Sequence, residues 1–326
     1  MSRLLDIIIP EYNTKQDLLV RALNSVNRQK NVDFNSIGII IVSDGSKTRY
    51  KKSWFKQRFP KLNIDYYYKE KNEGPGLTRQ FGIDKSEAKF ITFLDSDDEL
   101  YENNNFSSIL GYLDDSVESF FTLFVEEIIS NGVTQYRRYN PQDFPTLHGL
   151  FVKRSFLIEN NISFSNEIRY QEDTYFAQVL IFGYDSKILP IESYLWKNNE
   201  FSLVRTDKKE NWNVKIIEDY IKSAELVYKR LSILNKTVRH HQIVTSIYGA
   251  YIILQATSFD KDEERRIKNM KKLLDLYNEI KDDSYNYFTD DQRKVIFERQ
   301  LKTTSTSIQV DVKMTFDEYL KNRNIE

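Results

Sequence analysis

The chain has 326 residues, which is ample for a sizeable core and, at roughly 100–200 residues a domain, for more than one module. Lys and Arg total 47 and Asp and Glu total 48, so the formal net charge is -1 and there is no electrostatic case for nucleic acid as the main partner. The chain contains no cysteine, which excludes disulfides, thiolate zinc sites and a cysteine nucleophile.

The N-terminal stretch MSRLLDIIIPEYN lacks the long apolar region of a signal peptide. No apolar run approaches the roughly 20 residues that are needed to span a bilayer. The absence of cysteine also fits a reducing compartment. We therefore expect a cytoplasmic protein, and we leave open a peripheral contact with the inner face of the membrane.

The first half of the chain alternates strand and helix signals. Its expected elements are strands at 4–10, 37–46, 64–70 and 89–95, with helices at 15–29 and 74–84. Apolar strands that alternate with helices are typical of an α/β fold with a mostly parallel sheet, flanked by helices. Ligands of such sheets bind at the carboxyl ends of the strands, where this chain places its polar turns.

The second half changes character. Its expected elements are a strand at 120–129, a turn and helix at 147–160, a helix at 171–183 and a strand running into a polar loop at 192–206. From about residue 211 the signal is helical, and Val214, Ile217 and Ile221 begin a three- and four-residue spacing. A charged linker is expected at 260–272, before a third helix. We therefore expect a catalytic domain at 1–206 and a helical region at 207–326.

Two carboxylates, Asp95 and Asp97, directly follow the strand expected at 89–95. They can offer oxygens to Mg²⁺ or Mn²⁺, and a cation held by one or two carboxylates keeps positions for substrate phosphates. The alternative is a solvated acidic turn. Asp98 and Glu99 are interpreted as the start of the next helical turn, where acidic residues are favoured without a metal.

Three further stretches carry candidate residues, each with a plain structural alternative. Asp44 ends a strand, where it can accept an N–H of a base or form a simple turn. In NEGPGLTRQ the glycines let a ligand approach the backbone, and Arg79 can pair with phosphate or with an acidic side chain. Glu172 and Asp173 begin a helix, where carboxylates are favoured by the helix dipole, but one could serve as a general base.

Taken together, these motifs resemble those of the family 2 glycosyltransferases, in order and in spacing, over roughly residues 4–206. The motifs are Pro10-x-Tyr12-Asn13, Asp44-Gly45-Ser46, Gly74-Pro75-Gly76-x-x-Arg79, Asp95-Ser96-Asp97-Asp98 and Glu172-Asp173. The resemblance implies a GT-A fold, which is a Rossmann-like nucleotide-binding fold, followed here by an α-helical region. It also implies an inverting enzyme that moves a hexosyl or N-acetylhexosaminyl group from a UDP-sugar to a hydroxyl acceptor.

The resemblance further implies roles for matching residues. The residues implied at the nucleotide-sugar site are Pro10, Tyr12, Asn13, Asp44, Gly74, Arg79, Asp95 and Ser96. Asp44 would bind the uracil, Asp97 would ligate Mn²⁺ or Mg²⁺ with Asp95 beside it, and Asp173 would be the catalytic base. A last set would contact the acceptor or the diphosphate, and consists of His148, Glu172, Trp196, Lys197, Ser202 and Arg205.

Some positions depart from the family pattern. Ser43 stands where a first Asp is common, Thr78 and Gln80 flank Arg79 in place of Ala and Asn, and Lys197 replaces an Arg. His148 is equally compatible with a structural histidine.

The resemblance leaves the acceptor open among a glycan, a lipid-linked sugar, a polyol phosphate and a protein, as in the synthesis of cell-surface polysaccharide, teichoic acid or protein-linked glycans. Two rival classes remain. A non-catalytic sugar- or nucleotide-binding module would lose the base or the metal ligand, and a nucleotidyltransferase would carry a Gly-rich basic loop where this chain has PEYNTKQD. The C-terminal helices either pack within the protein or support a homo-oligomer or the docking of a partner.

Overall fold

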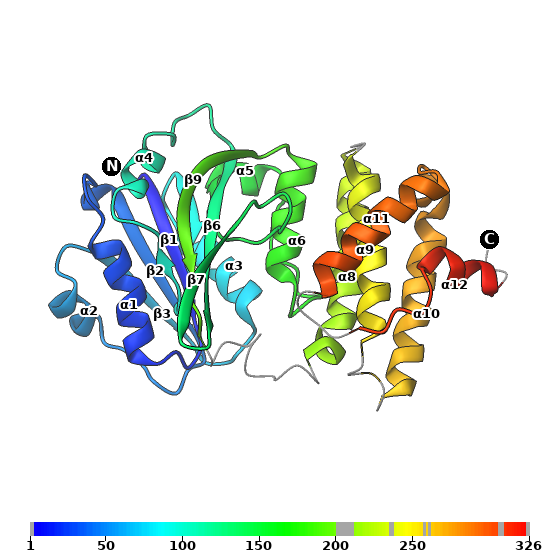
Figure 1. Ribbon diagram of the computed structural model, residues 1–326. Helices are drawn as coiled ribbons and strands as arrows, with labels where there is room; N and C mark the ends of the chain where they lie inside the picture. Colours follow the sequence, from blue (N-terminus) through cyan, green and yellow to red (C-terminus); the bar gives the residue numbers. More distant parts are fainter. Residues whose placement is uncertain are drawn as a thin grey trace. The chain divides into compact units, whose positions relative to one another are not determined.

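The computed structural model describes residues 3–199, 212–234, 238–256, 259, 262–305 and 310–323 (Figure 1). The chain divides into two compact units, Met1–Asn199 and Glu200–Glu326. The first unit is built around one nine-stranded sheet, and the described part of the second is helical. The helices of the described residues are too short or too polar to cross a membrane.

The first four strands of the sheet are parallel, as the sequence predicts. They are β1 (Leu5–Glu11), β2 (Ile37–Asp44), β3 (Asn63–Lys69) and β4 (Phe90–Phe93), in the order β3-β2-β1-β4. Apolar side chains of β1, β2 and β4 are buried in two clusters on opposite faces. Helices α1 (Gln16–Asn27) and α2 (Lys52–Arg58) contribute to one cluster, and α3 (Pro75–Lys85) contributes to the other. This arrangement confirms the expected α/β class.

Beyond β4 the sheet is mixed. The remaining strands are β8 (Leu150–Lys153), β6 (Ser119–Ser130), β9 (Lys187–Trp196) and β5 (Glu99–Leu100), with β7 (Val133–Tyr139) paired to β6. Strand β8 is antiparallel to both β4 and β6, whereas β9 is parallel to β6. The antiparallel pairing places the start of β8 beside the end of β4. Residues just before β8 therefore reach the edge of the sheet where ligands are expected.

Two local predictions need correction. The stretch 147–160 was expected to pass from a turn into a helix, but β8 comes first and helix α5 (Arg154–Glu159) follows. Leu150 and Val152 are completely buried between β4 and β6, so tertiary pairing decides their conformation. Glu99 lies in strand β5, paired with Leu195, and does not begin a helical turn. Strand β7 and helix α4 (Asn105–Leu110) were not predicted.

The expected helix at 171–183 is present in two parts, α6 (Glu172–Gln178) and a π-helical turn (Val179–Gly183). Helix α6 begins directly after Gln171, which has a positive φ of 65°. Its buried Phe176 belongs to the same cluster as Ile83 of α3. Packing in this cluster brings the first turn of α6 to α3, near the carboxyl edge of the sheet.

The second unit contains helices on both sides of the expected linker. They are α8 (Trp212–Ile233), α9 (Val238–Leu254), α10 (Glu263–Ile280), a π-helical turn (Lys281–Tyr285), α11 (Asp290–Ser305) and α12 (Phe316–Asn322). Most of the predicted linker at 260–272 is the first half of α10, with Asp262 as its N-cap. The periodic face of α8 that includes Ile217 and Ile221 is buried within the unit.

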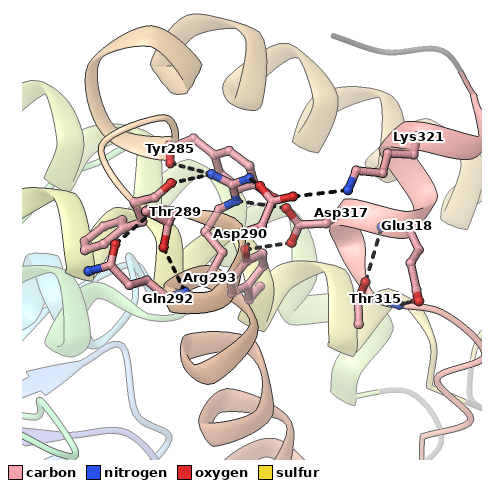
Figure 2. A network of polar contacts seen from close by, with 11 residues as sticks. Tyr285, Thr289, Asp290, Gln292, Arg293, Thr315, Asp317, Glu318 and Lys321 are labelled. Atoms are coloured by element: carbon pink, nitrogen blue, oxygen red, sulfur yellow. Dashed lines mark hydrogen bonds and ion pairs between the residues drawn. The ribbon is translucent and has the colours of Figure 1, made fainter.

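A polar network holds α12 against this unit (Figure 2). Nε of Arg293, on α11, donates to Oδ1 of Asp317 at 2.9 Å, and the hydroxyl of Tyr248, on α9, donates to Oδ2 at 3.0 Å. Nη1 of Arg293 also donates to the carbonyl of Phe288 at 2.6 Å. Because a partly buried charge needs such partners, the network specifies where the last helix packs.

Candidate active site

The polar residues singled out in the first half of the chain lie at the carboxyl ends of the parallel strands. Glu11 ends β1, Asp44 ends β2, and Asp95 follows β4 within two residues. Since β1 pairs with both β2 and β4 in parallel, these ends meet at one edge of the sheet. That edge is where open α/β sheets bind their ligands.

Glu11 organises the loop after β1, a role that the sequence did not reveal. Its carboxylate accepts the backbone N–H of Thr14 at 2.9 Å and the hydroxyl of Ser46 at 2.8 Å. The hydroxyl of Thr14 is 2.7 Å from that of Ser96. These bonds join the loops after β1, β2 and β4. The available sequence signal was a carboxylate directly after the first apolar run.

Two of the nucleotide-site predictions lie in this loop, and a third lies at the end of the strand before it. Pro10 belongs to the end of β1, and Tyr12 beyond it is 53% exposed, so its ring is free to meet a ligand. Asn13 has a positive φ of 51°, and its Oδ1 accepts the backbone N–H of Lys47 at 2.9 Å. The loop is thus held in one conformation while Tyr12 projects from it.

Asp44 is buried and holds the glycine loop before α3. It accepts the backbone N–H groups of Glu73 at 3.0 Å and Gly74 at 2.9 Å. Nζ of Lys69 lies 3.0 Å from its Oδ1. Gly74 has a φ of 93°, a conformation that favours glycine, so the loop depends on Gly74 as well as on Asp44. The carboxylate is therefore oriented before any ligand arrives, and Lys69 was not anticipated.

Arg79 is the charged centre of the site. Its Nη2 lies 2.6 Å from Oδ1 of Asp95, and its Nη1 lies 2.9 Å from Oε1 of Glu172. The guanidinium is buried, and it joins α3, the turn after β4 and the start of α6. The bridging of two carboxylates by one planar cation suits arginine rather than lysine.

The two residues that flank Arg79, where the chain departs from the family pattern, have hydrogen-bond partners. The hydroxyl of Thr78 donates to the carbonyl of Gly74 at 2.7 Å, and Oε1 of Gln80 accepts the backbone N–H of Phe164 at 3.1 Å. Both side chains thus have structural partners inside the unit.

The charges around Arg79 shift one another. Burial alone would lower the pKa of Arg79, but Asp95 and Glu172 outweigh it and hold the pKa above its ordinary value. Burial raises the pKa of Asp95, yet Arg79 brings it below its usual range. Burial, together with the neighbouring Asp173, raises the pKa of Glu172 to about 8 despite Arg79. The single positive charge of Arg79 therefore does not fully offset the negative charges of the neighbouring carboxylates.

Asp173 lies beside Glu172 in the first turn of α6. Its Oδ1 accepts the backbone N–H of Thr174 at 2.7 Å. Burial raises its pKa, against the opposing effect of Arg79. A carboxylate with a raised pKa is a stronger base than an ordinary aspartate, which suits proton abstraction near neutral pH.

The acidic turn after β4 is held by neutral donors as well as by cations. Oδ2 of Asp97 accepts from Nδ2 of Asn199 at 2.6 Å. Asp98 accepts from the hydroxyl of Tyr194 at 2.6 Å and from the backbone N–H of Lys197 at 2.8 Å. Neither carboxylate has a cationic side chain within 4 Å among the described residues. Burial and the neighbouring Asp97 raise the pKa of Asp98 well above its ordinary value.

Asp95, Asp98 and His148 form a group that could hold a metal ion. Each offers one ligand atom, and the three atoms lie within 4.8 Å of one another. Nδ1 of His148 is buried and has no hydrogen-bond partner among the described residues. Burial lowers the pKa of His148 to about 4, so its ring is neutral near pH 7 and able to ligate. Asp97, the ligand that the sequence suggested, is outside this group.

Trp196 and Lys197, which the resemblance places near the acceptor or the diphosphate, lie in different environments. Nζ of Lys197 is paired with Glu127 and lies 3.8 Å from Oε1 of Glu99, so its charge is shared with two buried carboxylates. The ring of Trp196 packs 5.6 Å from that of His148. Ser202 and Arg205 lie outside the described residues.

Comparison with known proteins identifies the class of protein that this fold and site define, a glycosyltransferase with a GT-A fold. The model of glycosyl transferase family 2 matches residues 6–177, and the chain belongs to this family. The chain is 23% identical over 249 residues to the glycosyltransferase GlyG of Streptococcus pneumoniae, which spans 68% of this chain and 80% of GlyG.

Two further proteins resemble this chain. A Campylobacter jejuni GalNAc(5)-diNAcBac-PP-undecaprenol beta-1,3-glucosyltransferase is 33% identical over 97 residues, 29% of this chain and only 30% of that protein. The structure of S. aureus TarS 1-349 has a TM-score of 0.62 at 16% identity and covers 93% of this chain and 90% of that one. The same TarS fragment has been solved with UDP, with a TM-score of 0.60. The fold predicted from the motifs is thereby confirmed.

Proposed function

We propose that the protein transfers a sugar from a UDP-sugar to a hydroxyl group of an acceptor, by a single displacement that inverts the anomeric centre. The observation that carries this proposal is the bridge from Asp95 through Arg79 to Glu172. The bridge fixes the turn after β4 close to the first turn of α6. The turn after β4 carries the carboxylates proposed to act on the leaving group, and α6 carries the carboxylate proposed to activate the nucleophile. The bridge holds both sets at one site.

The donor is held by the loops at the carboxyl ends of β1, β2 and β4. Tyr12 is exposed and offers a ring face to the base, and Asp44 is oriented by Gly74 to accept the imide N–H of uracil. The structural likeness to a protein solved with UDP supports a uridine nucleotide. Asp95, whose side chain is 32% exposed, is placed to reach the ribose or the donor sugar.

Asp173 is the general base in this proposal. An acceptor hydroxyl is a weak nucleophile until its proton is removed, and a positioned carboxylate can remove it. Glu172 next to it is engaged with Arg79, whereas among the described residues the side chain of Asp173 has hydrogen bonds only to Thr174, in its own helical turn. The attacking oxygen then displaces the nucleoside diphosphate from the opposite face of the sugar.

The acidic turn fits a divalent cation. Its carboxylates, Asp97 and Asp98, have only neutral side-chain or backbone donors as close partners among the described residues, and Nδ1 of His148 is buried without one. When bound, a Mn²⁺ or Mg²⁺ ion stabilises the negative charge that develops on the diphosphate. Asp95, Asp97 and Asp98 supply the candidate carboxylate ligands.

The sugar is a hexosyl or N-acetylhexosaminyl group, and the acceptor is a glycan or lipid-linked glycan of the cell surface. The Campylobacter relative is named for a polyprenol-linked acceptor, which favours this class over a protein acceptor. Transfer to such an acceptor would take place at the inner face of the membrane.

A screen of nucleotide sugars for Mn²⁺-dependent hydrolysis tests the proposal without knowledge of the acceptor. We expect one or a few UDP-sugars to be hydrolysed slowly, and EDTA to stop the reaction. Release of UDP from no donor, with or without acceptor extracts, would refute the proposal. Undiminished turnover in EDTA would refute its metal requirement alone.

A further inference from the structure

His148 is held rigidly beside the acidic turn. Its ring stacks on Tyr194, with centroids 4.3 Å apart and planes inclined by 22°, and meets the edge of Phe124 at 5.0 Å. Its backbone N–H donates to Oγ1 of Thr146 at 3.0 Å, and Gly149 follows with a φ of 75°. Because packing already fixes the ring, the ligation of an ion would cost little side-chain entropy.

The buried Nδ1 of His148 has no partner among the described residues. Leaving a buried polar atom unsatisfied costs about 1–3 kcal/mol, so such atoms call for an explanation. One ring nitrogen shares a 4.8 Å group with carboxylate oxygens of Asp95 and Asp98. An ion with ligand distances of about 2 Å separates its donors by about 3–4 Å, so a small contraction of the group would bring its three ligand atoms within reach of one ion.

The two carboxylates of this group are oriented by neighbouring side-chain and backbone donors. Tyr194 and the backbone of Lys197 bind Asp98, and Arg79 binds Oδ1 of Asp95. Hydrogen bonds of this kind are typical around metal ligands, whose geometry and basicity they set.

We propose that His148 is a nitrogen ligand of the active-site cation, together with Asp95 and Asp98, and that it makes the site select Mn²⁺ over Mg²⁺. The inference rests on the metal requirement of the proposed function. Mg²⁺ binds almost entirely through oxygen, whereas first-row transition ions accept imidazole. An oxygen-only site in the acidic turn would not discriminate in this way.

Pulsed electron paramagnetic resonance on the Mn²⁺-loaded full chain tests the ligand directly. The chain has three histidines, His148 and the adjacent pair His240 and His241, so a ¹⁴N coupling can be assigned by substitution. We expect a coupling in the wild type that disappears in His148→Gln and persists in His241→Gln. Mn²⁺ bound without nitrogen coupling in the wild type, or a coupling that survives His148→Gln, would overturn the proposal.

Affinities provide a second measurement. We expect His148→Gln to weaken Mn²⁺ binding by about 10-fold or more and Mg²⁺ binding far less, with His241→Gln unchanged. Equal weakening of Mn²⁺ binding and Mg²⁺ binding would overturn the proposed role of His148 in selectivity. If His148→Gln misfolds, a coupling that persists in both His240→Gln and His241→Gln still assigns the nitrogen to His148. A nitrogen coupling in a protein that transfers no sugar would refute the proposed function and leave the ligand assignment standing. Metal-dependent transfer without a nitrogen coupling would refute only the assignment of His148 as a ligand.

Discussion

Nη2 of Arg79 and Oδ1 of Asp95 lie 2.6 Å apart and form a partly buried ion pair between α3 and the turn after β4. The same guanidinium reaches Glu172, so the pair is part of a three-segment junction. In the proposed function this junction links the donor-binding residues to the general base. Both the stability of the unit and the geometry of the proposed site would then depend on Arg79.

Arg79→Met should lower the free energy of unfolding of the first unit by about 3–5 kcal/mol, because it leaves the buried Glu172 and the partly buried Asp95 without their cation. Urea unfolding measures the loss. Arg49→Met is the matched control, since Arg49 is 66% exposed and lies 4.0 Å from an exposed Glu70, so it should cost less than about 1 kcal/mol. Equal costs for the two variants would contradict the role of Arg79.

Asp173→Asn should reduce sugar transfer by about 10²–10⁴-fold while leaving the affinity for UDP unchanged, because it removes the proton acceptor and keeps the shape. Transfer is followed by product analysis, and UDP binding by calorimetry. Asp17→Asn, at an exposed position in the first turn of α1, should alter neither quantity. A parallel loss of UDP binding in Asp173→Asn would argue against the base assignment.

Lys197→Met separates a structural role from a diphosphate-binding role. Because Lys197 is paired with Glu127 and lies near Glu99, we expect a loss of about 3 kcal/mol in unfolding free energy and little change in UDP affinity. Lys187→Met, at an exposed position of β9, should change neither. Weaker UDP binding at unchanged stability would instead support the contact that the family resemblance implied.

Gly82→Ala should destabilise the packing of α3 on β1. A Cβ at this position would lie 2.4 Å from Cγ2 of Ile8, and overpacking of this kind costs about 1–3 kcal/mol. The double variant with Ile8→Ala provides the control, because the added methyl group then enters the space that Ile8 vacates. Thermal unfolding of the four proteins should show a smaller cost of Gly82→Ala in the Ile8→Ala background. Strictly additive costs would contradict the proposed contact.

Arg293→Gln should release α12 from the second unit, because Asp317 would lose its ion pair and the carbonyl of Phe288 its donor. We expect faster proteolysis at the last helix and a loss of about 3 kcal/mol in unfolding free energy. Lys321→Gln is the control, since Lys321 is 70% exposed and its pair with Asp290 should contribute less than about 1 kcal/mol. Unchanged proteolysis of Arg293→Gln would show that apolar contacts suffice to hold α12.

The four parallel strands and the helices α1 and α3 were predictable because their signals are local. Apolar runs such as those of β1 and β2 are buried on both faces, and the turns that close them carry polar residues. Strand β8 was missed because its four residues look the same as the start of a helix, and only its pairing with β4 and β6 distinguishes the two. The strand β7 is mostly exposed and lacks an apolar pattern.

The sequence by itself determined that acidic and glycine-rich turns follow consecutive parallel strands, and hence that a site lies at that edge of the sheet. Only the tertiary structure decided which side chains meet there. Asp95 and His148 are 53 positions apart in the chain, and the antiparallel pairing of β8 with β4 brings them together. Asp98 joins them because Tyr194, near the end of β9, turns it inward. Such partners depend on strand order and orientation, which no local pattern of residues specifies.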